Sequence, residues 1–274
     1  MKTIKLNNGV TIPTIGLGTY KIGLNDDDVY RAVRCALDNG YRHIDTATLY
    51  QNEIPIGKAI RESGIAREEI FVTTKLWGSD ILNNQIQKSF DGSLQNLELD
   101  YIDLYLVHWP VKCMLQSTWK ELEKIFRSGK VKAIGISNHL IHHMKEVLKV
   151  AEIKPVVNQM ELHPYLIQQD VIDFCKKHNI VPEAWSPLGS SKVPLLKDEV
   201  LIWIGGKYGK TPAQVVLRWN TQRGVVAIPK SSNIERQLEN FKIFDFELTD
   251  EEIKQINDLD KNHRTGIHPD NIEF

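Results

Sequence analysis

Several features are scarce or missing in this 274-residue sequence, and each absence excludes a class of protein. No stretch approaches the roughly eighteen consecutive apolar residues that a transmembrane helix needs. Neither sign of charge is in excess, since 34 Lys and Arg stand against 35 Asp and Glu and give a formal net charge of −1. This balance argues against a nucleic-acid-binding or membrane-surface protein, because both usually carry a basic excess.

Cysteine is also scarce. Cys35, Cys113 and Cys175 are widely spaced, and no CxxC pair is present. This usage predicts buried thiols in a reducing compartment and argues against a disulfide framework or a cysteine zinc site. Residues 1–8 contain no apolar run of the signal-peptide kind. We therefore expect a cytoplasmic protein without membrane or nucleic-acid partners, and its mixed charges predict a monomer.

What the sequence does contain is a repeated pair of patterns. A short β-branched or apolar run is followed by an amphipathic helical pattern, and this pair recurs along the chain. Before the first pair, a hairpin is predicted from strands at 3–6 and 10–12, turned at Asn8-Gly9. Eight strand-like runs then follow, at residues 15–18, 43–45, 70–75, 101–108, 131–137, 156–160, 180–185 and 225–229.

Eight strand–helix units predict an α/β fold, the (β/α)8 TIM barrel, in which helices surround parallel strands. We expect one such domain over residues 1–274. The longest interval precedes the eighth strand, and its two helical patterns, at 195–208 and 212–223, predict an extra helix there. The alternative, a doubly wound sheet, would need G-x-G-x-x-G after its first strand. Lys21 stands in place of the third glycine, so that fingerprint fails.

Polar residues stand at the ends of three consecutive predicted strands. Asp45, Lys75 and His108 occupy these ends, and Tyr50 follows five residues after Asp45. Each alone has an ordinary role, because an aspartate can cap a turn, a lysine can reach solvent, and a tyrosine or histidine can pack in a core. Barrel enzymes carry their reactive groups on the rim formed by these strand ends. Four such groups on one rim therefore indicate a catalytic site.

Together these four side chains would make a proton donor. A tyrosine hydroxyl has a pKa of roughly 10 and is a poor acid at neutral pH. A nearby ammonium favours the phenolate, so we expect Lys75 to lower the pKa of Tyr50, and Asp45 to keep Lys75 charged. The imidazole of His108 can hold a carbonyl oxygen. The sequence thus predicts machinery that polarises and protonates a carbonyl as a hydride arrives.

Five segments resemble the motifs of the aldo-keto reductases, in the family's order. They are residues 40–53 (GYRHIDTATLYQNE), 74–77 (TKLW), 106–110 (LVHWP), 135–138 (GISN) and 228–231 (IPKS). The resemblance implies a barrel enzyme that reduces aldehydes and ketones to alcohols with NADPH, without a Rossmann domain. It implies that Tyr50 is the general acid, that Lys75 and Asp45 tune it, and that His108 orients the substrate carbonyl.

The same resemblance implies a path for the cofactor over the barrel mouth. Ser137, Asn138 and Gln159 match positions that hold the nicotinamide carboxamide. Trp185 matches an aromatic residue that stacks on the nicotinamide ring. The other contacts implied at this end are Asp45, the pyrophosphate and ribose residues Gly18, Thr19 and Tyr20, and the segment Ser186, Pro187 and Leu188.

Residues 230–240 also have a physical interpretation. They follow the eighth strand and open a predicted helix, whose free N–H groups and dipole attract phosphate. Lys230 and Arg236 add two cations, although an ordinary solvated helix start would look the same. The resemblance favours NADPH over NADH, because it implies contacts to the 2′-phosphate and the adenine. These implied contacts are Lys230, Ser231, Ser232 and Arg236 for the phosphate, and Glu239 and Asn240 for the adenine.

Aromatic residues are expected around the substrate. Tyr20, Trp77 and Trp109 would join Tyr50 and His108 in a pocket for a small carbonyl compound. Ordinary packing in the core is the alternative role for the aromatic residues among them. Few residues follow the fourth and seventh strands before the next helical pattern, and the C-terminal tail is brief. These short loops predict an open, shallow pocket. In this respect the sequence resembles the bacterial branch of the family that includes glyoxal and 2,5-diketogluconate reductases.

Three residues depart from the family pattern, and one of them is Tyr20, which stands where many relatives have tryptophan at the pocket wall. Trp185 stands where tyrosine is usual, and an indole can stack on nicotinamide equally well. Gly78 stands where asparagine is common, and we expect it to loosen its loop. A separate cluster, His139, His142 and His143, has no acidic third ligand at a diagnostic spacing, so we predict no metal site.

Two other functions remain compatible with the sequence. The resemblance includes channel-associated subunits that bind the cofactor as regulators, so turnover could be incidental. A lysine at a strand end could also form a Schiff base in a barrel aldolase, with Lys75 as nucleophile. Purified protein that lacks turnover would favour the first, and borohydride trapping of substrate on Lys75 would favour the second.

Overall fold

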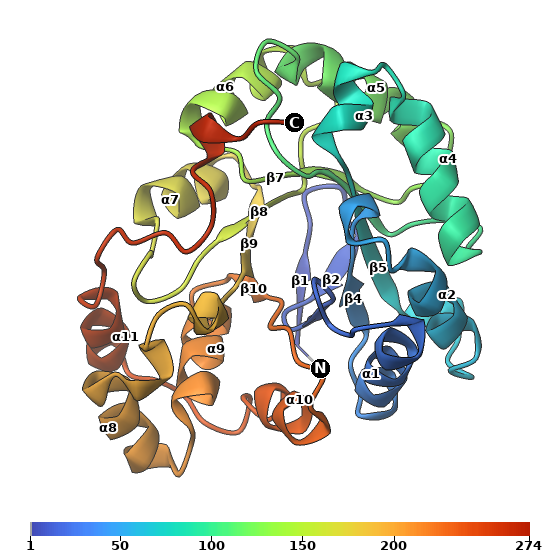
Figure 1. Ribbon diagram of the computed structural model, residues 1–274. Coiled ribbons are helices and arrows are strands. Elements are labelled where there is room, and N and C mark those ends of the chain that lie inside the picture. Colours follow the sequence, from blue (N-terminus) through green and yellow to red (C-terminus); the bar gives the residue numbers. More distant parts are fainter. Residues whose placement is uncertain (1) are drawn as a thin grey trace.

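Eight parallel strands form one sheet in the computed structural model, which describes residues 2–274 (Figure 1). Each strand pairs with its successor in the sequence, and the last returns to the first. The N–H of Gly16 donates to the carbonyl of Ala227 at 2.9 Å, and that of Gly18 to Pro229 at 3.1 Å. This closure confirms the predicted barrel. The strands are β3 (Leu17–Gly18), β4 (His43–Asp45), β5 (Phe71–Leu76), β6 (Leu104–Val107), β7 (Ile134–Ser137), β8 (Val157–Glu161), β9 (Val181–Trp185) and β10 (Val226–Ala227).

Helices surround the strands on the outside of the barrel (Figure 1). Two of them separate β9 from β10, which confirms the extra helix predicted there. Among residues 2–274, no helix is long and apolar enough to cross a membrane. The helices are α1 (Asp26–Asp38), α2 (Glu53–Arg61), α3 (Gly78–Leu82), α4 (Ile86–Leu97), α5 (Leu115–Arg127), α6 (Ile141–Val150), α7 (Gln169–Lys177), α8 (Glu199–Tyr208), α9 (Pro212–Gln222), α10 (Ile234–Phe241) and α11 (Asp250–Asn257).

Helix α1 illustrates how local sequence forms this outer layer. The Asn25 side chain caps its first turn by accepting from the N–H of Asp28 at 3.0 Å. Val29, Val33 and Ala36 recur at helical spacing and are buried against the barrel. The helix therefore begins at a capping residue and is held by one apolar face.

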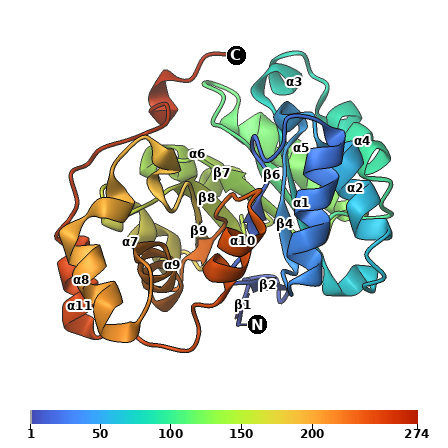
Figure 2. The ribbon, with the colours of Figure 1, turned by 60° about the horizontal axis from the view of Figure 1, so that its bottom comes forward.

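The predicted N-terminal hairpin is present and lies at one end of the barrel. Strands β1 (Thr3–Lys5) and β2 (Thr11–Pro13) pair antiparallel, and Gly9 has the positive φ of +92° that the turn requires. Leu6 and Ile12 are buried in one cluster with interior strand residues such as Phe71 and Leu104. The hairpin of β1 and β2 and the C-terminal segment lie at opposite ends of the barrel (Figure 2), so the hairpin covers the end away from the C-terminus.

The cysteines only partly match expectation. All three are free thiols, which agrees with the absence of a disulfide framework in the sequence. Cys175 is buried and Cys35 is half-buried. Cys113 is exposed, so the prediction of buried thiols is wrong at that position. It lies in the loop between β6 and α5, where the chain runs over the surface.

Candidate active site

The four predicted catalytic side chains meet on one rim of the barrel. Asp45 ends β4, Lys75 lies next to the end of β5, and His108 follows β6 directly. Tyr50 ends a short 3-10 helix, Thr48–Tyr50, which the Thr48 hydroxyl ties to the carbonyl of Lys75 at 3.0 Å. Lys75 Nζ donates to Asp45 Oδ1 at 2.5 Å and to Tyr50 Oη at 3.4 Å. The rings of Tyr50 and His108 lie 5.6 Å apart.

Lys75 is a buried ammonium with three oxygen partners. Besides Asp45 and Tyr50, its Nζ donates to the carbonyl of Thr46 at 2.8 Å. Burial alone would lower the pKa of Lys75, but the nearby Asp45 carboxylate and Tyr50 raise it above its ordinary value. The amine is therefore held protonated and has no lone pair to attack a carbonyl. This arrangement argues against the aldolase interpretation.

Tyr50 differs from the sequence expectation. Lys75 acts on its pKa in the predicted direction and lowers it, but the loss of hydration on burial is larger. Asp45 and Tyr20 also raise the pKa, so the net direction is upward. The expectation of a net lowering of the Tyr50 pKa is thus wrong. The hydroxyl is held firmly protonated, in the state that a proton donor needs.

His108 is neutral in this environment. Burial, followed by the positive charge of Lys75, holds its pKa well below the ordinary value. Among the described residues, its buried Nδ1 has no hydrogen-bond partner. Its ring meets Tyr50 and Trp77 edge-on, at 5.6 and 5.3 Å between centroids. A neutral imidazole retains one N–H, which can donate to a carbonyl oxygen.

The residues expected to hold a carboxamide form a connected polar row. Asn138 adopts a positive φ of +60° directly after Ser137, which ends β7. Its Oδ1 accepts from Trp185 Nε1 at 2.8 Å, so the indole is fixed by a hydrogen bond. Gln159 Nε2 donates to Asp45 Oδ2 at 2.7 Å, which links this row to the rim carboxylate.

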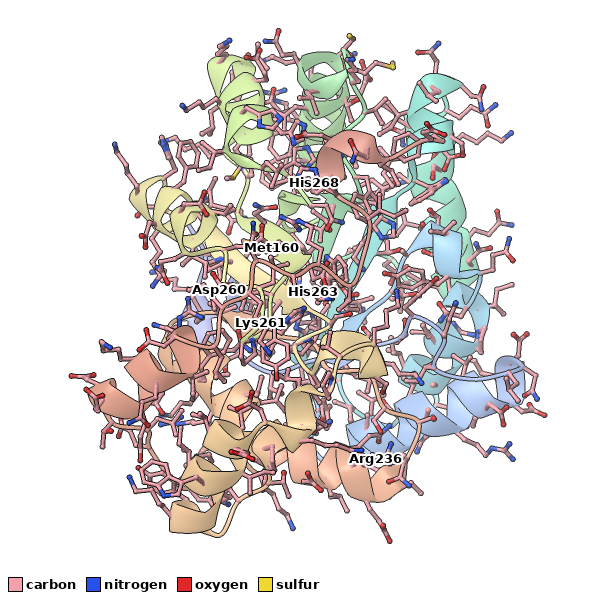
Figure 3. All side chains as sticks on the ribbon, turned by 60° about the vertical axis from the view of Figure 1, so that its left-hand side comes forward. Met160, Arg236, Asp260, Lys261, His263 and His268 are labelled. Carbon is pink, nitrogen blue, oxygen red and sulfur yellow. The ribbon has the colours of Figure 1, made fainter. Side chains whose placement is uncertain are left out.

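The C-terminal tail, residues 258–274, runs from α11 past α7 toward α6 (Figure 1), and its last residue contacts Trp77. The Phe274 ring packs edge-on against Trp77 at 5.3 Å. A Cβ added to Gly78 would meet that ring at 2.1 Å, so the glycine makes room for the tail. The expectation of a loosened loop is therefore wrong, because Phe274 packs against Gly78 and Trp77. Figure 3 follows the tail through its labelled residues Asp260, Lys261, His263 and His268.

Glu161 fixes the tail to β8. It accepts from the N–H and the hydroxyl of Thr265, both at 2.6 Å, and from the N–H of Gly266 at 3.1 Å. These hydrogen bonds and that of His163 outweigh burial and lower the pKa of Glu161 to about 2. A Cβ on Gly266 would lie 2.6 Å from the Trp185 ring, so the tail also touches the indole. Sequence reasoning missed these tail contacts, because they join segments far apart in the chain.

The predicted phosphate segment begins α10, as expected. The Asn233 side chain caps this helix by accepting from the N–H of Arg236 at 2.9 Å. Lys230, Ser232 and Arg236 are exposed, whereas Ser231 is buried. Neither Lys230 nor Arg236 forms an ion pair with any residue in 2–274. Arg236 is visible on α10 in Figure 3.

The two residues expected at the adenine are already engaged or enclosed. Glu239 Oε1 accepts from the Thr211 hydroxyl at 2.6 Å, and its carbonyl accepts from Gln214 Nε2 at 3.1 Å. Asn240 is buried. Adenine contacts by Glu239 and Asn240 therefore stay a prediction. An adenine that contacts the Glu239 carboxylate would compete for it with the Thr211 hydroxyl.

The remaining residues predicted to contact cofactor or substrate differ in how far they are exposed at the rim. Gly18 has the carbonyl of Ile228 only 2.7 Å from the place of a Cβ, and the Thr19 hydroxyl donates to the carbonyl of Asp45 at 2.8 Å. Tyr20 is 51% exposed, and its ring lies 4.9 Å from that of Tyr50. The other members are Trp109, which is 9% exposed and offers little surface to a ligand, and the turn Ser186, Pro187 and Leu188, which follows β9.

Histidines and a carboxylate converge away from the rim. His142 Nε2 and His143 Nε2 lie 2.9 and 3.1 Å from Asp270 Oδ1, a partner that sequence spacing did not reveal. The N–H of Leu140 donates to His143 Nδ1 at 3.2 Å, so the neutral ring carries its proton on Nε2. That N–H points at Asp270 Oδ1 and can donate to it. The group thus holds the tail to α6 by hydrogen bonds, and His139 stays outside it.

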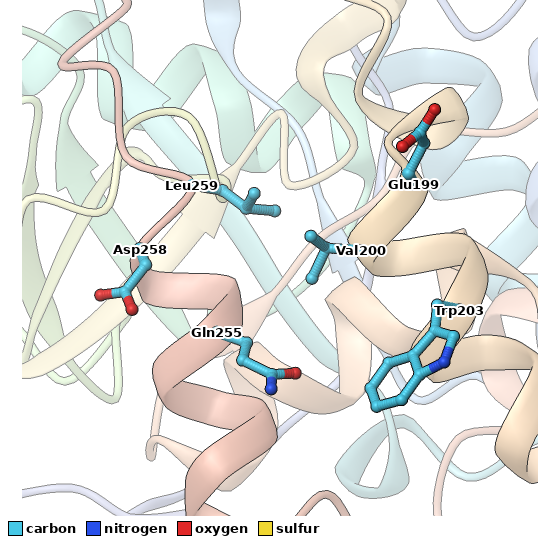
Figure 4. A pocket seen from close by; sticks show the side chains of 6 residues that line it. All are labelled: Glu199, Val200, Trp203, Gln255, Asp258 and Leu259. Carbon is cyan, nitrogen blue, oxygen red and sulfur yellow. The ribbon is translucent and has the colours of Figure 1, made fainter.

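A surface groove of about 530 Å³ lies between α8 and α11 (Figure 4). Its walls are mostly apolar, with the exposed Trp203 at one side. None of its residues belongs to the rim that carries Lys75 and Tyr50. The lining residues are Glu199, Val200, Trp203, Gln255, Asp258 and Leu259.

Comparison with known proteins agrees with this geometry. The profile of the Aldo/keto reductase family matches residues 14–261. The chain is 49% identical to the glyoxal reductase of Bacillus subtilis, over 99% of this chain and 98% of that protein. It is also 49% identical to a 9,11-endoperoxide prostaglandin H2 reductase of Trypanosoma cruzi, over 98% of this chain and 95% of that protein. A solved structure, the aldo-keto reductase MGS-M4 from a deep-sea metagenome library, matches with a TM-score of 0.96 and 45% identity, over 99% of this chain and 100% of that chain. The chain therefore belongs to the aldo/keto reductase family of oxidoreductases.

Proposed function

We propose that this protein reduces small aldehydes and ketones to alcohols with NADPH, and that Tyr50 is the general acid. The observation that carries the proposal is the buried ammonium of Lys75, which contacts both Asp45 and Tyr50. A tyrosine hydroxyl beside a permanent positive charge is stabilised as its proton leaves. The same rim holds a neutral imidazole at His108, which suits hydrogen bonding to a carbonyl oxygen.

The donor set on this rim fits a nicotinamide dinucleotide phosphate. Gln159 uses Nε2 within the protein, and among the described residues nothing donates to its Oε1, which is left to accept from a carboxamide. Trp185 is held by Asn138 and offers an aromatic surface beside that amide. Lys230 and Arg236, without ion pairs in residues 2–274, match the charge of a 2′-phosphate at the start of α10. When bound, the nicotinamide supplies the hydride that reaches the carbonyl carbon.

The side chains divide the remaining work. The His108 N–H holds the carbonyl oxygen and polarises the C=O bond. Tyr50 Oη gives its proton to that oxygen as negative charge develops there. Lys75 stabilises the tyrosinate that remains, and Asp45 keeps Lys75 charged and in place. Each of these steps uses a group that the fold already holds on the rim.

The surroundings of Tyr50 suit a small substrate. Tyr20 and Trp77 present aromatic surfaces on two sides, and Phe274 packs against Trp77 from the tail. Bacillus subtilis glyoxal reductase is named for a two-carbon dicarbonyl, and it shares half of its residues with this chain. We therefore expect methylglyoxal and simple aromatic aldehydes to be accepted.

The test follows loss of NADPH absorbance with methylglyoxal and with an aromatic aldehyde, for wild type and Y50F. We expect wild-type turnover, and a loss of most of it in Y50F with NADPH binding retained. The ring of phenylalanine keeps the packing against Tyr20, so binding controls for the fold. Equal rates in both proteins would disprove the acid role. Absence of turnover in folded wild type would instead favour the cofactor-binding regulator.

A matched pair of variants tests the cofactor choice. K230A and R236A each remove one cation and should weaken NADPH binding while leaving NADH binding nearly unchanged. K242A, at the other end of α10, is the control for general loss of positive charge. Equal weakening of both cofactors in K230A and R236A would contradict the assignment of the 2′-phosphate.

A further inference from the structure

A second buried acid lies beneath the rim and has no place in the mechanism above. Glu183, in the middle of β9, is fully buried, and its Oε2 accepts from Gln159 Nε2 at 3.1 Å. Its Oε1 has no hydrogen-bond partner among the described residues. The nearest ring nitrogen, His43 Nε2, lies 3.7 Å away. A buried carboxylate without a cationic partner is costly, and such a group tends to stay protonated.

Glu183 is connected to the proton donor through Gln159. The same Nε2 that donates to Glu183 donates to Asp45 Oδ2 at 2.7 Å, and Asp45 Oδ1 accepts from Lys75. Lys75 in turn donates to Tyr50. A continuous chain of hydrogen bonds therefore runs from Glu183 to the reacting hydroxyl, and a change at one end alters the field at the other.

The charged and titratable groups around Glu183 come from two strands. His43 and Asp45 belong to β4, and Lys75 belongs to β5. The neighbouring strand β8 supplies the neutral Gln159. The residues of β10 that pair with β9 are the apolar Val226 and Ala227. The positive charge of Lys75 is already matched by Asp45, so an ionised Glu183 would have no cation of its own.

The protonation states follow from this balance. Burial, followed by the negative charge of Asp45, raises the pKa of Glu183 to about 8, although Gln159 and Lys75 act against the shift. Burial and Lys75 lower the pKa of His43 to about 3, so the imidazole is neutral and cannot pair with Glu183 as a cation. Glu183 is therefore a neutral carboxylic acid at neutral pH and becomes an anion in alkali.

We propose that Glu183 is a positioning residue of the proton donor: as a neutral acid it orients the Gln159 amide against Asp45, and as an anion it adds negative charge to the field at Lys75 and Tyr50. This inference rests on the proposed function for its kinetic consequence. Added negative charge opposes formation of the tyrosinate, so Tyr50 becomes a weaker acid. Reduction should then slow as Glu183 loses its proton, by at most about tenfold for each unit by which the pKa of Tyr50 rises.

The kinetic experiment is a single-turnover measurement of NADPH oxidation from pH 6 to pH 10, which removes product release from the rate. Wild type should show a decline centred near pH 8, the pKa of Glu183. E183Q keeps an acceptor for Gln159 but cannot ionise, so the decline should vanish. E183D should restore it, and a structural role alone would not predict this restoration. A profile that is the same in E183Q and wild type would overturn the proposal.

A second measurement separates this proposal from the proposed function. Ultraviolet difference titration of the tyrosines, with Y50F as the reference for each background, reports the ionisation of Tyr50 without turnover. We expect Tyr50 to ionise at lower pH in E183Q than in wild type, because the anion is absent. If carbonyl reduction failed but this shift appeared, the proposed function would be wrong and the role of Glu183 would stand. An unchanged Tyr50 titration in folded E183Q would refute the role of Glu183.

Discussion

Removing the ammonium of Lys75 should destabilise the protein strongly, and the loss should be recoverable by a second substitution. Lys75 and Asp45 are almost fully buried and lie 2.5 Å apart. K75M keeps the length of the side chain but leaves Asp45 as a buried carboxylate without a cation. Breaking a buried pair from one side costs about 3–5 kcal/mol, which is a large part of the roughly 5–15 kcal/mol by which a typical domain is stable.

The double variant D45N/K75M removes both charges and keeps an amide that can accept from Gln159. Replacing both partners of a buried pair is often neutral, so we expect the free energy of unfolding to return to within about 1 kcal/mol of wild type. Urea unfolding of wild type, both single variants and the double variant gives the coupling energy directly. The reasoning would fail if K75M were as stable as wild type, or if the double variant were no more stable than K75M.

The loss of stability in the single variant K75M should also depend on pH, in a direction that the pKa of Asp45 determines. Burial already raises the pKa of Asp45 in the intact protein, and Lys75 opposes that rise. Without Lys75, the folded-state pKa of Asp45 should rise further above its unfolded value. A carboxyl with a raised folded-state pKa destabilises the fold when it ionises, so the deficit of K75M should shrink as pH falls through that pKa. Urea midpoints measured at several pH values check this.

Two further predictions concern the C-terminal tail. G78A puts a methyl group where the Phe274 ring lies, so it should displace the tail and remove the edge-on contact of Phe274 with Trp77, worth about 0.5–1.5 kcal/mol. The KM for aromatic aldehydes should then change in G78A as it does in a variant that lacks Phe274. A wild-type KM in G78A would contradict this. The low pKa of Glu161, about 2, means that its hold on the tail is complete above the unfolded-state value and is lost as pH falls toward 2. The protection factor of the Thr265 amide, which is its hydrogen exchange measured relative to the intrinsic rate at each pH, should therefore fall in acid in wild type. E161Q should show low protection at every pH, and wild-type protection in E161Q would refute the anchoring role of Glu161.

The barrel and its rim residues could be predicted from sequence because they follow from local rules. Alternating strand and helix patterns specify the βα units, and parallel pairing brings the strand ends that carry Asp45, Lys75 and His108 to one edge. The helix that opens within residues 230–240 was likewise predicted from its place directly after the eighth strand, and the structure adds Asn233 as its capping residue. In each case the information lies within a few residues of the position that it determines.

Only the tertiary structure decided the energies and the long-range contacts. The sign of the Tyr50 pKa shift was mispredicted because the sequence names the charged neighbour but not the burial that outweighs it. The sequence analysis assigned no role to Glu183, because only the pairing of β8 with β9 places it beside Gln159 and only its burial leaves Oε1 without a partner among the described residues. Gly78 was taken for a loosened loop because the Phe274 ring that it accommodates lies at the far end of the chain. Local pattern thus specified which groups reach the rim, and the packing of distant segments set their charge states and the shape of the pocket.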